Sequence, residues 1–442
     1  MATQTTFNAL QQLRTRLQEA RGNTDRLFQI VREDSLYERP IPERHRIVFY
    51  IGHLEAFDWN LFREHLFSAK SFSPAFDQLF AFGIDPVDGG LPTDRPEDWP
   101  SLLEVRSYVQ TLRRVIDGAL DAGNFRDPAD AGGASSETLL HVAVEHRLMH
   151  AETLAYMFHQ LPYPQKVPQP QSPSDGAPIE NGLIEIPGGS ATLGLSRDSG
   201  APFGWDNEFE SHTVTVPRFR VSKFMVTNAE FLRFVEDGGY QNPRLWSEQD
   251  WQWKERSGIR HPAFWKQSGS AWTYHGMFEA LPFPTNWPVY VSHAEAGAYA
   301  RWANASLPTE AQWHRAAYGT PQGPERDYPW GSSAPTQNLG NFDFHRWDAS
   351  HVNAFPTNKS AFGVVGQLGN GWEWTVTPFA PLPGFQPATF YPGYSANFFD
   401  GQHYVIKGGS ARTAACLLRR SFRNWFQPHY QYVYAGFRCV SE

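Results

Sequence analysis

A Pro-, Gln- and Ser-rich stretch, PYPQKVPQPQSPSDGAP at residues 162–178, divides the chain into two halves of different texture. Before it, apolar residues recur at helical spacing, and after it short apolar alternations are separated by Gly, Pro and Asn. A segment of this composition is expected to be extended and poorly ordered on its own. We therefore predict two domains, residues 1–162 and residues 181–442, joined by a linker over residues 163–180.

The first half is predicted to be a four-helix bundle. Apolar stripes indicate one helix in each of four segments, namely residues 5–31, residues 42–67, a stretch that begins near Pro100, and residues 136–160. Amphipathic helices of about 20 residues are typical of an up-and-down bundle. The stretch 71–100, rich in Pro, Gly and Asp, is predicted to be a long loop of the kind that often carries function.

The second half is predicted to be an α+β domain dominated by loops. Aromatic residues make up 15% of the chain, and Gly and Pro number 36 and 34, which favours many turns around short elements. We expect helices over residues 227–237 and 292–303. Strands are expected over residues 183–186, 213–216, 289–291 and 404–406.

Composition excludes several classes of protein. The net charge of −8 and the absence of a basic stripe argue against a nucleic-acid partner. No run of 18 apolar residues exists, and the N-terminus shows no signal peptide, so we expect a cytoplasmic protein without a membrane-spanning helix. The only cysteines, Cys416 and Cys439, exclude a disulfide scaffold and a cysteine-rich metal site.

Three histidines of the first half are candidates for one metal site. His146 and His150 lie four residues apart on a predicted helix, so their imidazoles share a face, and His53 lies on the inward stripe of another helix. Histidines in bundles also occur as surface residues or as hydrogen-bonded core residues. All-imidazole ligation suits Zn, Fe, Cu or Ni without choosing between them, and three protein ligands leave positions open for catalysis. Glu145 and Glu152 point away from the shared face and rank lower as ligands.

The second half resembles a known family over about residues 181–442. The motifs that carry the resemblance are IEIPGGSATLG, VTNAEFLRFVEDGGY, LPTEAQWHRAAYG, YPWG, LGNGWEWT, VIKGGSA and YAGFRC. Together they resemble the formylglycine-generating-enzyme-like (sulfatase-modifying-factor) fold, an α+β domain of the C-type-lectin-like kind. The helical half, with its three histidines, resembles a DinB-like bundle. The pairing of these domains in one chain is similar to the ergothioneine-type sulfoxide synthases.

This resemblance implies a mononuclear non-haem iron oxidoreductase that uses O2 to form a C–S bond on the imidazole of hercynine (trimethylhistidine). It implies Fe(II) held by His53, His146 and His150. Formylglycine-generating oxidases use a cysteine pair near the C-terminus, but only Cys416 follows the GGS motif here, and Cys439 lies in the GFRC motif. A copper dithiolate site is therefore not expected, and both cysteines are predicted to be small buried apolar residues.

The hercynine contacts of the family are partly present. An Asn-Trp pair survives as Asn424-Trp425, and a Trp face suits a quaternary ammonium through a cation–π contact. The alternative is a core Trp beside a capping Asn. Some members place a Gln just before the second metal histidine of the helix, where Met149 stands here and cannot make the same hydrogen bond to substrate.

The residues that would bind the sulfur or selenium donor differ from those of the family. Members that use γ-glutamylcysteine carry an acidic residue and an Arg where this chain has Phe426 and Tyr430, and an Arg that aligns with Gly89 or Gly90. Without these charges a doubly charged thiol would lose charge-assisted bonds worth about 1.5–3 kcal/mol each. A neutral selenosugar such as 1-selenoglucose is favoured, as in the selenoneine synthase branch of the family. The alternative is an ergothioneine sulfoxide synthase that takes cysteine or γ-glutamylcysteine.

A tyrosine of the family supplies a proton during O2 reduction, and Tyr391 and Tyr394 are the two candidates, with a packing role as the alternative for either. Two other classes of protein are alternatives to this enzyme. A zinc-dependent thiol transferase would use the same three histidines without needing the lectin-like half. A non-catalytic binding protein would leave those histidines without a role.

Overall fold

The computed structural model describes residues 2–84, 90–126, 133–170 and 179–442. Contacts divide the chain into two compact units. The first unit contains residues 1–169 together with Thr389–Tyr391, and the second contains residues 170–388 and 392–442. The predicted domain boundaries remain a prediction, and part of the predicted linker, residues 171–178, lies outside the described residues.

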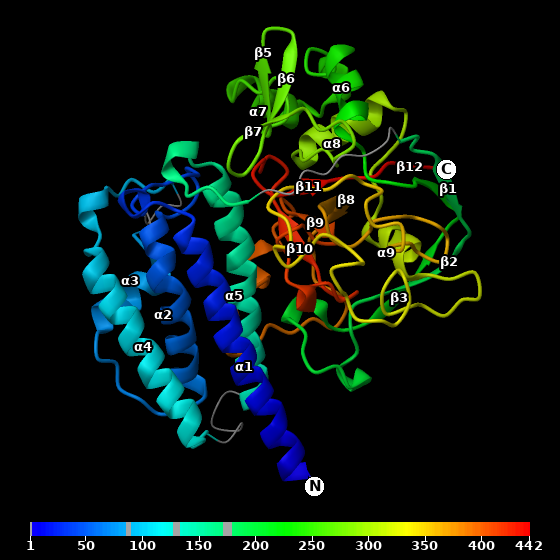
Figure 1. Cartoon of the computed structure of the whole chain (residues 1–442). Helices are drawn as coiled ribbons and strands as arrows, with labels where there is room; N and C mark the ends of the chain where they lie inside the picture. Colours follow the sequence, from blue (N-terminus) through cyan, green and yellow to red (C-terminus); the bar gives the residue numbers. More distant parts are fainter. Residues whose placement is uncertain (1, 85–89, 127–132, 171–178) are drawn as a thin grey trace. The chain divides into compact units, whose positions relative to one another are not determined.

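Over its described residues, the first unit is built from four long helices and one short helix, which Figure 1 shows in blue to blue-green. The helix α1 packs against α5, and α2 packs against α3, α4 and α5. The pattern of apolar stripes therefore indicated the four long helices of the bundle. Their bounds are α1 Ala2–Gln29, α2 Ile47–His65, α4 Leu102–Ala122 and α5 Ser136–His159, and the short helix is α3 Pro74–Phe82.

Local sequence signals begin and end these helices. Ser101 caps the first turn of α4 in a capping box with Glu104, and α4 ends at Gly123, whose φ of 67° is the left-handed conformation that glycine favours. The Ser135 hydroxyl accepts a hydrogen bond from the backbone N–H of Thr138 at the start of α5.

The prediction of a continuous loop over residues 71–100 was wrong, because α3 lies within it. Pro74 occupies the first turn of α3, where a missing N–H costs nothing. The buried carboxylate of Asp77 then ties α3 to two neighbours, since it accepts hydrogen bonds from Trp59 Nε1 at 3.0 Å and from the Tyr108 hydroxyl at 2.7 Å. These tertiary bonds stabilise a helix too short to be recognised from its sequence alone.

Over its described residues, the second unit combines four helices with four small sheets. Its helices are α6 Asn228–Glu236, α7 Glu248–Arg256, α8 His293–Trp302 and α9 Glu310–Tyr318. The sheets have the strand orders β1-β4-β12, β10-β9-β8-β11, β2-β3 and β5-β6-β7, and among the described strand pairs only β8–β11 is parallel. The strands are β1 Leu183–Ile186, β2 Gly189–Leu193, β3 His212–Val216, β4 Phe219–Ser222, β5 Trp265–Ser268, β6 Ala271–His275, β7 Ala280–Pro282, β8 Trp372–Pro378, β9 Tyr404–Lys407, β10 Asn424–Phe426, β11 Ala435–Gly436 and β12 Val440–Ser441.

The predicted helices at 227–237 and 292–303 are present as α6 and α8, but α7 and α9 were missed. The start of α9 carries a capping box between Thr309 and Gln312, a sequence signal that would have revealed it. The strand predicted at residues 289–291 was wrong. Val289 donates to the carbonyl of Val226 and Val291 donates to that of Ala435, so the bonds go to two separate segments and no ladder forms.

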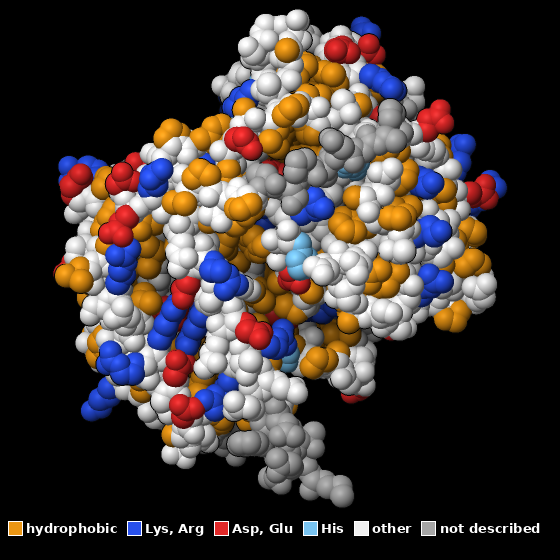
Figure 2. All heavy atoms as spheres, viewed as in Figure 1, with side chains coloured by type: hydrophobic (Ala, Val, Ile, Leu, Met, Phe, Trp, Pro, Cys, Tyr) orange, Lys and Arg blue, Asp and Glu red, His pale blue; other side chains and the backbone are white. Residues whose placement is uncertain are grey.

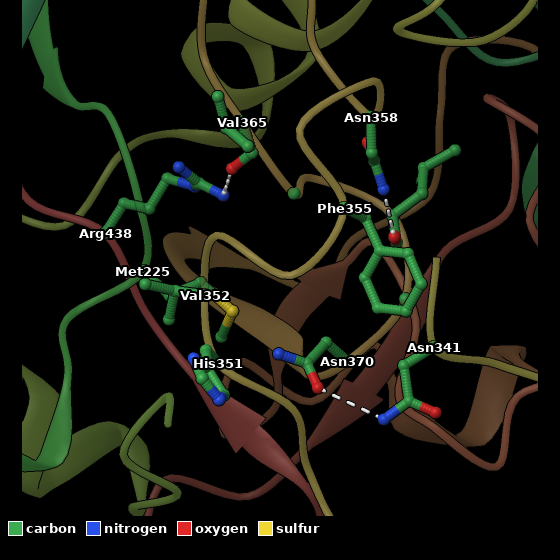
Figure 3. A pocket seen from close by; sticks show the side chains of 12 residues that line it. Met225, Asn341, His351, Val352, Phe355, Asn358, Val365, Asn370 and Arg438 are labelled. Carbon is green, nitrogen blue, oxygen red and sulfur yellow. Dashed lines mark hydrogen bonds between the residues drawn. The ribbon is translucent and has the colours of Figure 1, made fainter. Parts of the chain in front are cut away.

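A buried polar cluster supports the loops of the second unit (Figure 3). Arg438 donates to the carboxylate of Glu373 at 2.8 Å and to the carbonyl of Val365 at 2.6 Å. Asn341 Nδ2 and Asn370 Oδ1 lie 3.3 Å apart beside a cavity of about 10 Å³, which is room for one water molecule. The long loops of this unit are therefore held by buried polar side chains as well as by apolar packing.

Charged side chains are mixed on the face of the molecule in Figure 2, where Lys and Arg alternate with Asp and Glu over the helical unit.

Of the helices that the structure describes, none is both long and apolar enough to span a bilayer.

Candidate metal centre

His53, His146 and His150 lie together inside the helical unit. Each offers a ring nitrogen, and these three atoms lie within 4.8 Å of one another. The Nε2 atoms of His53 and His150 are 3.3 Å apart. Two nitrogens at bond lengths of about 2.1 Å from one ion would be separated by roughly 3.0–3.4 Å, so this spacing suits ligands of a single metal.

Burial keeps the three imidazoles neutral. It lowers the pKa of His53 to about 4, although the hydrogen bond to the Phe80 carbonyl opposes the shift. Burial and the neighbouring histidines also hold the pKa values of His146 and His150 well below the usual range. Neutral imidazoles keep the lone pairs that a metal needs, so no proton has to be displaced at neutral pH.

The donor set fits a divalent transition metal. Among the residues that the structure describes, the buried Nδ1 atoms of His146 and His150 have no hydrogen-bond partner, and His53 Nδ1 lies 2.7 Å from the carbonyl oxygen of Phe80. Since a carbonyl only accepts, His53 carries its proton on Nδ1, which leaves Nε2 free as a ligand. Three imidazoles suit Fe(II), Zn(II), Cu(II) or Ni(II), and within the described residues neither Glu145 nor Glu152 joins the group.

Two aromatic rings border the triad. Phe57 stacks on His146 with ring centroids 3.4 Å apart and planes 12° from parallel. Tyr391 belongs to the same unit by its contacts, and its ring lies 5.4 Å from that of Phe57 and 6.5 Å from that of His146. Phe57 was not predicted as a site residue, although its position four residues after His53 places it on the same helical face.

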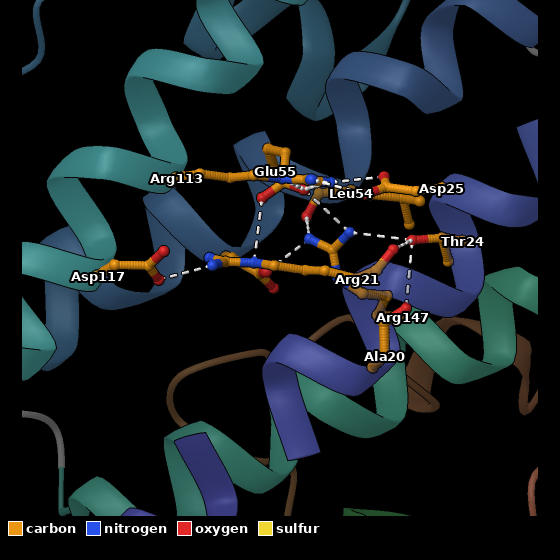
Figure 4. Close-up of polar contacts among 10 residues, drawn as sticks. Ala20, Arg21, Thr24, Asp25, Leu54, Glu55, Arg113, Asp117 and Arg147 are labelled. Atoms are coloured by element: carbon orange, nitrogen blue, oxygen red, sulfur yellow. Dashed lines mark hydrogen bonds and ion pairs between the residues drawn. The ribbon is translucent and has the colours of Figure 1, made fainter. Parts of the chain in front are cut away.

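A buried ionic network joins α2 and α5, the two helices that carry the triad, to Arg113 of α4 and Arg21 of α1 (Figure 4). Arg147 bonds Asp58 at 2.7 Å and lies 3.1 Å from Glu55, which also pairs with Arg113 at 2.7 Å. Burial alone would raise the pKa of Glu55, but Arg147, Arg21 and Arg113 lower it to about 2. Since His146 immediately precedes Arg147, the network fixes the segment of α5 that carries the candidate ligand.

Two further predicted site residues, Met149 and Gly89, belong to the first half of the chain. Met149, which directly precedes His150 on α5, is half-buried and keeps its backbone carbonyl bonded to the Thr153 hydroxyl. Gly89 lies outside the described residues, while Gly90 is described and exposed. The remaining predicted substrate residues are all in the second unit and are described there.

Asn424 and Trp425 lie on the edge strand β10 of the second unit. Trp425 stacks on Phe379 with centroids 4.1 Å apart, and Tyr394 and Phe398 flank it at 5.6 and 5.5 Å. Asn424 Oδ1 accepts the backbone N–H of Trp425 at 2.9 Å. Phe379 covers one face of the indole, so a cation–π contact would use the other face.

Phe426 and Tyr430 form a stacked pair, with centroids 5.4 Å apart and planes 12° from parallel. Tyr432 adds an edge contact to Tyr430 at 5.2 Å. The intervening His429 is paired through Nε2 with the Asp250 carboxylate at 2.9 Å. The two positions thus present an aromatic platform.

Tyr394 lies in a different environment from Tyr391. Its ring stacks on Trp205 with centroids 4.0 Å apart. The neighbouring Asp206 carboxylate accepts the Ser395 hydroxyl at 2.5 Å and the Ala388 N–H at 3.4 Å. The Asp206 carboxylate therefore holds both ends of the segment that carries the two tyrosines. No local sequence pattern predicts this contact, because Asp206 is distant in the sequence.

Neither Cys416 nor Cys439 forms a disulfide. Cys439 is buried, as predicted, and burial raises the pKa of its thiol to about 12. Cys416 is only half-buried, so the prediction of full burial was wrong for this residue.

Two family models match different parts of the chain. A family model described as the sulfatase-modifying factor enzyme 1-like domain matches residues 169–442, and one for the DinB superfamily matches residues 16–154. A protein of Mycolicibacterium thermoresistibile named hercynine oxygenase is 36% identical over 381 residues, which cover 83% of this chain and 80% of that protein.

Two further relatives carry related names. The hercynine oxygenase of Mycobacterium tuberculosis is 42% identical over 54% of this chain, and the match spans 56% of that protein's length. Ergothioneine biosynthesis protein 1 of Neurospora crassa is 27% identical over 94% of this chain and 56% of its own length. With its DinB domain, its sulfatase-modifying-factor-like domain and these relatives, the chain belongs to the ergothioneine-type sulfoxide synthase family of enzymes.

Proposed function

We propose that the chain is a selenoneine synthase, an O2-dependent non-haem iron enzyme that joins the imidazole carbon of hercynine to the selenium of a selenosugar. The observation that carries the metal assignment is the convergence of three neutral imidazoles, with ligand atoms within 4.8 Å of one another. The names of the relatives support hercynine as one substrate and O2 as another. Fe(II), when bound, would supply the site at which O2 is reduced.

The aromatic platform of Phe426 and Tyr430 supports a neutral donor. Stacked rings offer apolar faces to the C–H groups of a sugar, and they offer no counter-charge to two carboxylates and an ammonium. Burial of those charges without partners is costly, so γ-glutamylcysteine would bind weakly. Cysteine and γ-glutamylcysteine are the competing donors, because the relatives' names include ergothioneine biosynthesis.

Each residue has a distinct role in this proposal. His53, His146 and His150 hold the metal, Asn424 and Trp425 bind hercynine, and Tyr391 delivers a proton through its hydroxyl. Tyr391 is preferred to Tyr394 because its ring lies 6.5 Å from that of His146, within one unit. In the overall reaction the imidazole C–H and the Se–H hydrogens leave, one oxygen of O2 is transferred to selenium, and the other leaves as water.

The test is a donor competition on the full-length protein reconstituted anaerobically with Fe(II). Hercynine, 1-selenoglucose and γ-glutamylcysteine are supplied with O2, and the coupled products are quantified by mass spectrometry. We expect the selenium product to dominate. A kcat/KM for γ-glutamylcysteine equal to that for selenoglucose, or above it, would restore the ergothioneine assignment.

The metal assignment has its own test. The His146→Ala protein should fold but lose bound iron and turnover, whereas His65→Ala, at the end of α2 and outside the triad, should keep both. Full iron stoichiometry in His146→Ala would refute the site. Zinc in place of iron in the protein as purified, with activity restored by zinc, would instead support a thiol transferase.

A further inference from the structure

The three candidate ligands differ in how their second ring nitrogen is held. Only for His53 does the structure, over its described residues, give a protein partner: Nδ1 donates to the carbonyl of Phe80 at 2.7 Å. Phe80 lies in the last turn of α3, where backbone carbonyls lack intrahelical partners. This end of a helix carries partial negative charge, so it is a strong acceptor for an imidazole N–H.

The carbonyl reaches His53 because α3 packs against α2. At Gly52, the residue before His53, the ring of Phe80 lies directly over the glycine. A Cβ atom added at Gly52 would lie 2.3 Å from Cδ1 and 2.4 Å from Cγ of that ring. Only a residue without a side chain permits this approach, and we call the space over Gly52 the notch.

The ring of Phe80 cannot retreat from an added methyl group at low cost. It is fully buried and stacks on Tyr108 on its other side, with centroids 5.6 Å apart and planes 28° from parallel. Asp77 locks α3 from the opposite end of the helix through its bonds to Trp59 and Tyr108. Any substitution that fills the notch must therefore displace α3, and the carbonyl of Phe80 moves with it.

We propose that the notch at Gly52 is a positioning device for the metal ligand His53, acting through the main-chain carbonyl of Phe80. The carbonyl selects the tautomer with the proton on Nδ1, orients the ring, and increases the basicity of Nε2 toward the metal. Gly52 and Phe80 are positioning residues, since neither side chain contacts the metal. The inference rests on the proposed metal site, but the tautomer of His53 is a property of the metal-free protein.

The experiment uses Gly52→Ala in the full-length protein, with Gly118→Ala as the matched control. Gly118 lies within α4, and a Cβ added there would meet nothing within 4 Å. Co(II) affinity is measured by anaerobic titration of the visible absorption bands, and the His53 tautomer is read from long-range ¹H–¹⁵N spectra of the metal-free protein. In Gly52→Ala we expect Co(II) to bind about 10- to 100-fold more weakly, with loss of the Nδ1–H signature. Gly118→Ala should keep both properties.

A rescue variant separates positioning from general damage. In Gly52→Ala/Phe80→Ala the ring that clashes is gone but the carbonyl at position 80 remains, so the tautomer and most of the Co(II) affinity should return. If Gly52→Ala does not fold, Asp77→Ala takes its place, because it releases α3 without filling the notch, and it should lose the same two signals. Asp77→Asn is its conservative partner.

Two results would overturn the proposal. The first is a folded Gly52→Ala protein with wild-type Co(II) affinity, and the second is weakened affinity with an unchanged His53 tautomer. If the wild-type protein itself binds no Co(II) or Fe(II) while the tautomer responds to the notch as described, the metal assignment fails and the positioning of His53 stands.

Discussion

Tyr391 points its ring toward that of His146, with centroids 6.5 Å apart and planes at 71°. Only three residues later, Tyr394 stacks on Trp205 and meets the edge of Trp425. Two tyrosines that are equivalent in the sequence thus lie in different surroundings, one beside the candidate metal ligands and one among the aromatic residues of the second unit.

This difference predicts unequal effects of removing their hydroxyls. Tyr391→Phe should lower turnover by about 100-fold, the scale of a lost general acid, while iron content stays unchanged. Tyr394→Phe keeps the stacked ring and should change turnover little. Single-turnover kinetics with O2 would check both variants. Equal losses would mean that neither hydroxyl has the special role assigned to Tyr391.

Removing the indole in Trp425→Ala should weaken hercynine binding by about 0.5–2 kcal/mol through the lost cation–π contact. Plain histidine lacks the trimethylammonium group and should lose less. Calorimetric titration of both ligands gives the comparison, and Trp330→Ala serves as control because Trp330 stacks on Tyr328 instead. The same loss for both ligands would argue for a packing role of Trp425.

Restored charge at the aromatic platform should redirect the choice of donor. In Phe426→Asp/Tyr430→Arg each new charge can pair with γ-glutamylcysteine, and charge-assisted hydrogen bonds contribute about 1.5–3 kcal/mol each. We expect the ratio of kcat/KM for γ-glutamylcysteine over selenoglucose to rise at least about tenfold. Tyr430→Phe, which keeps the stack, should leave the ratio unchanged. A double variant with the wild-type ratio would show that these positions do not select the donor.

The Arg147 network should dominate the stability of the helical unit. Arg147→Met leaves the buried carboxylates of Glu55 and Asp58 without their shared partner, and breaking such a buried pair costs about 3–5 kcal/mol. Arg106→Met removes only an exposed pair with Glu33 and should cost less than about 1 kcal/mol. Urea unfolding monitored by circular dichroism distinguishes the two. Similar midpoints would contradict the prediction.

Lowering the pH should reveal how much the ionised Glu55 carboxylate contributes to the stability of the folded protein. Its pKa in the folded protein, about 2, lies below the ordinary value of 4.5, so the ionised carboxylate stabilises the folded state above pH 4.5. This stabilisation is lost as the pH falls from 4.5 through 2, and it amounts to about 3 kcal/mol by linkage. The stability difference between wild type and Glu55→Gln, measured from pH 7 to pH 3, should therefore shrink toward acid. A difference independent of pH would mean that Glu55 is not ionised in the folded protein.

Patterns of residues close together in the chain were sufficient to predict part of this structure. Helical periodicity indicated the four long helices, and the spacing of His146 and His150 placed both on one face, since 3.6 residues per turn brings positions four apart together. Ser135 and Ser101 marked helix starts through hydrogen bonds made within three residues. Each of these features depends on neighbours in the chain, so the sequence by itself determined them.

The remaining features depended on tertiary structure, because the groups that contact one another are distant in the sequence. The helix α3 depends on Asp77 reaching Trp59 and Tyr108, and the tautomer of His53 depends on a main-chain carbonyl 27 residues away, which no side-chain pattern encodes. The different surroundings of Tyr391 and Tyr394 likewise depend on rings that are distant in the sequence. Local spacing specifies which residues share a face, but only packing between elements determines which groups that face will meet.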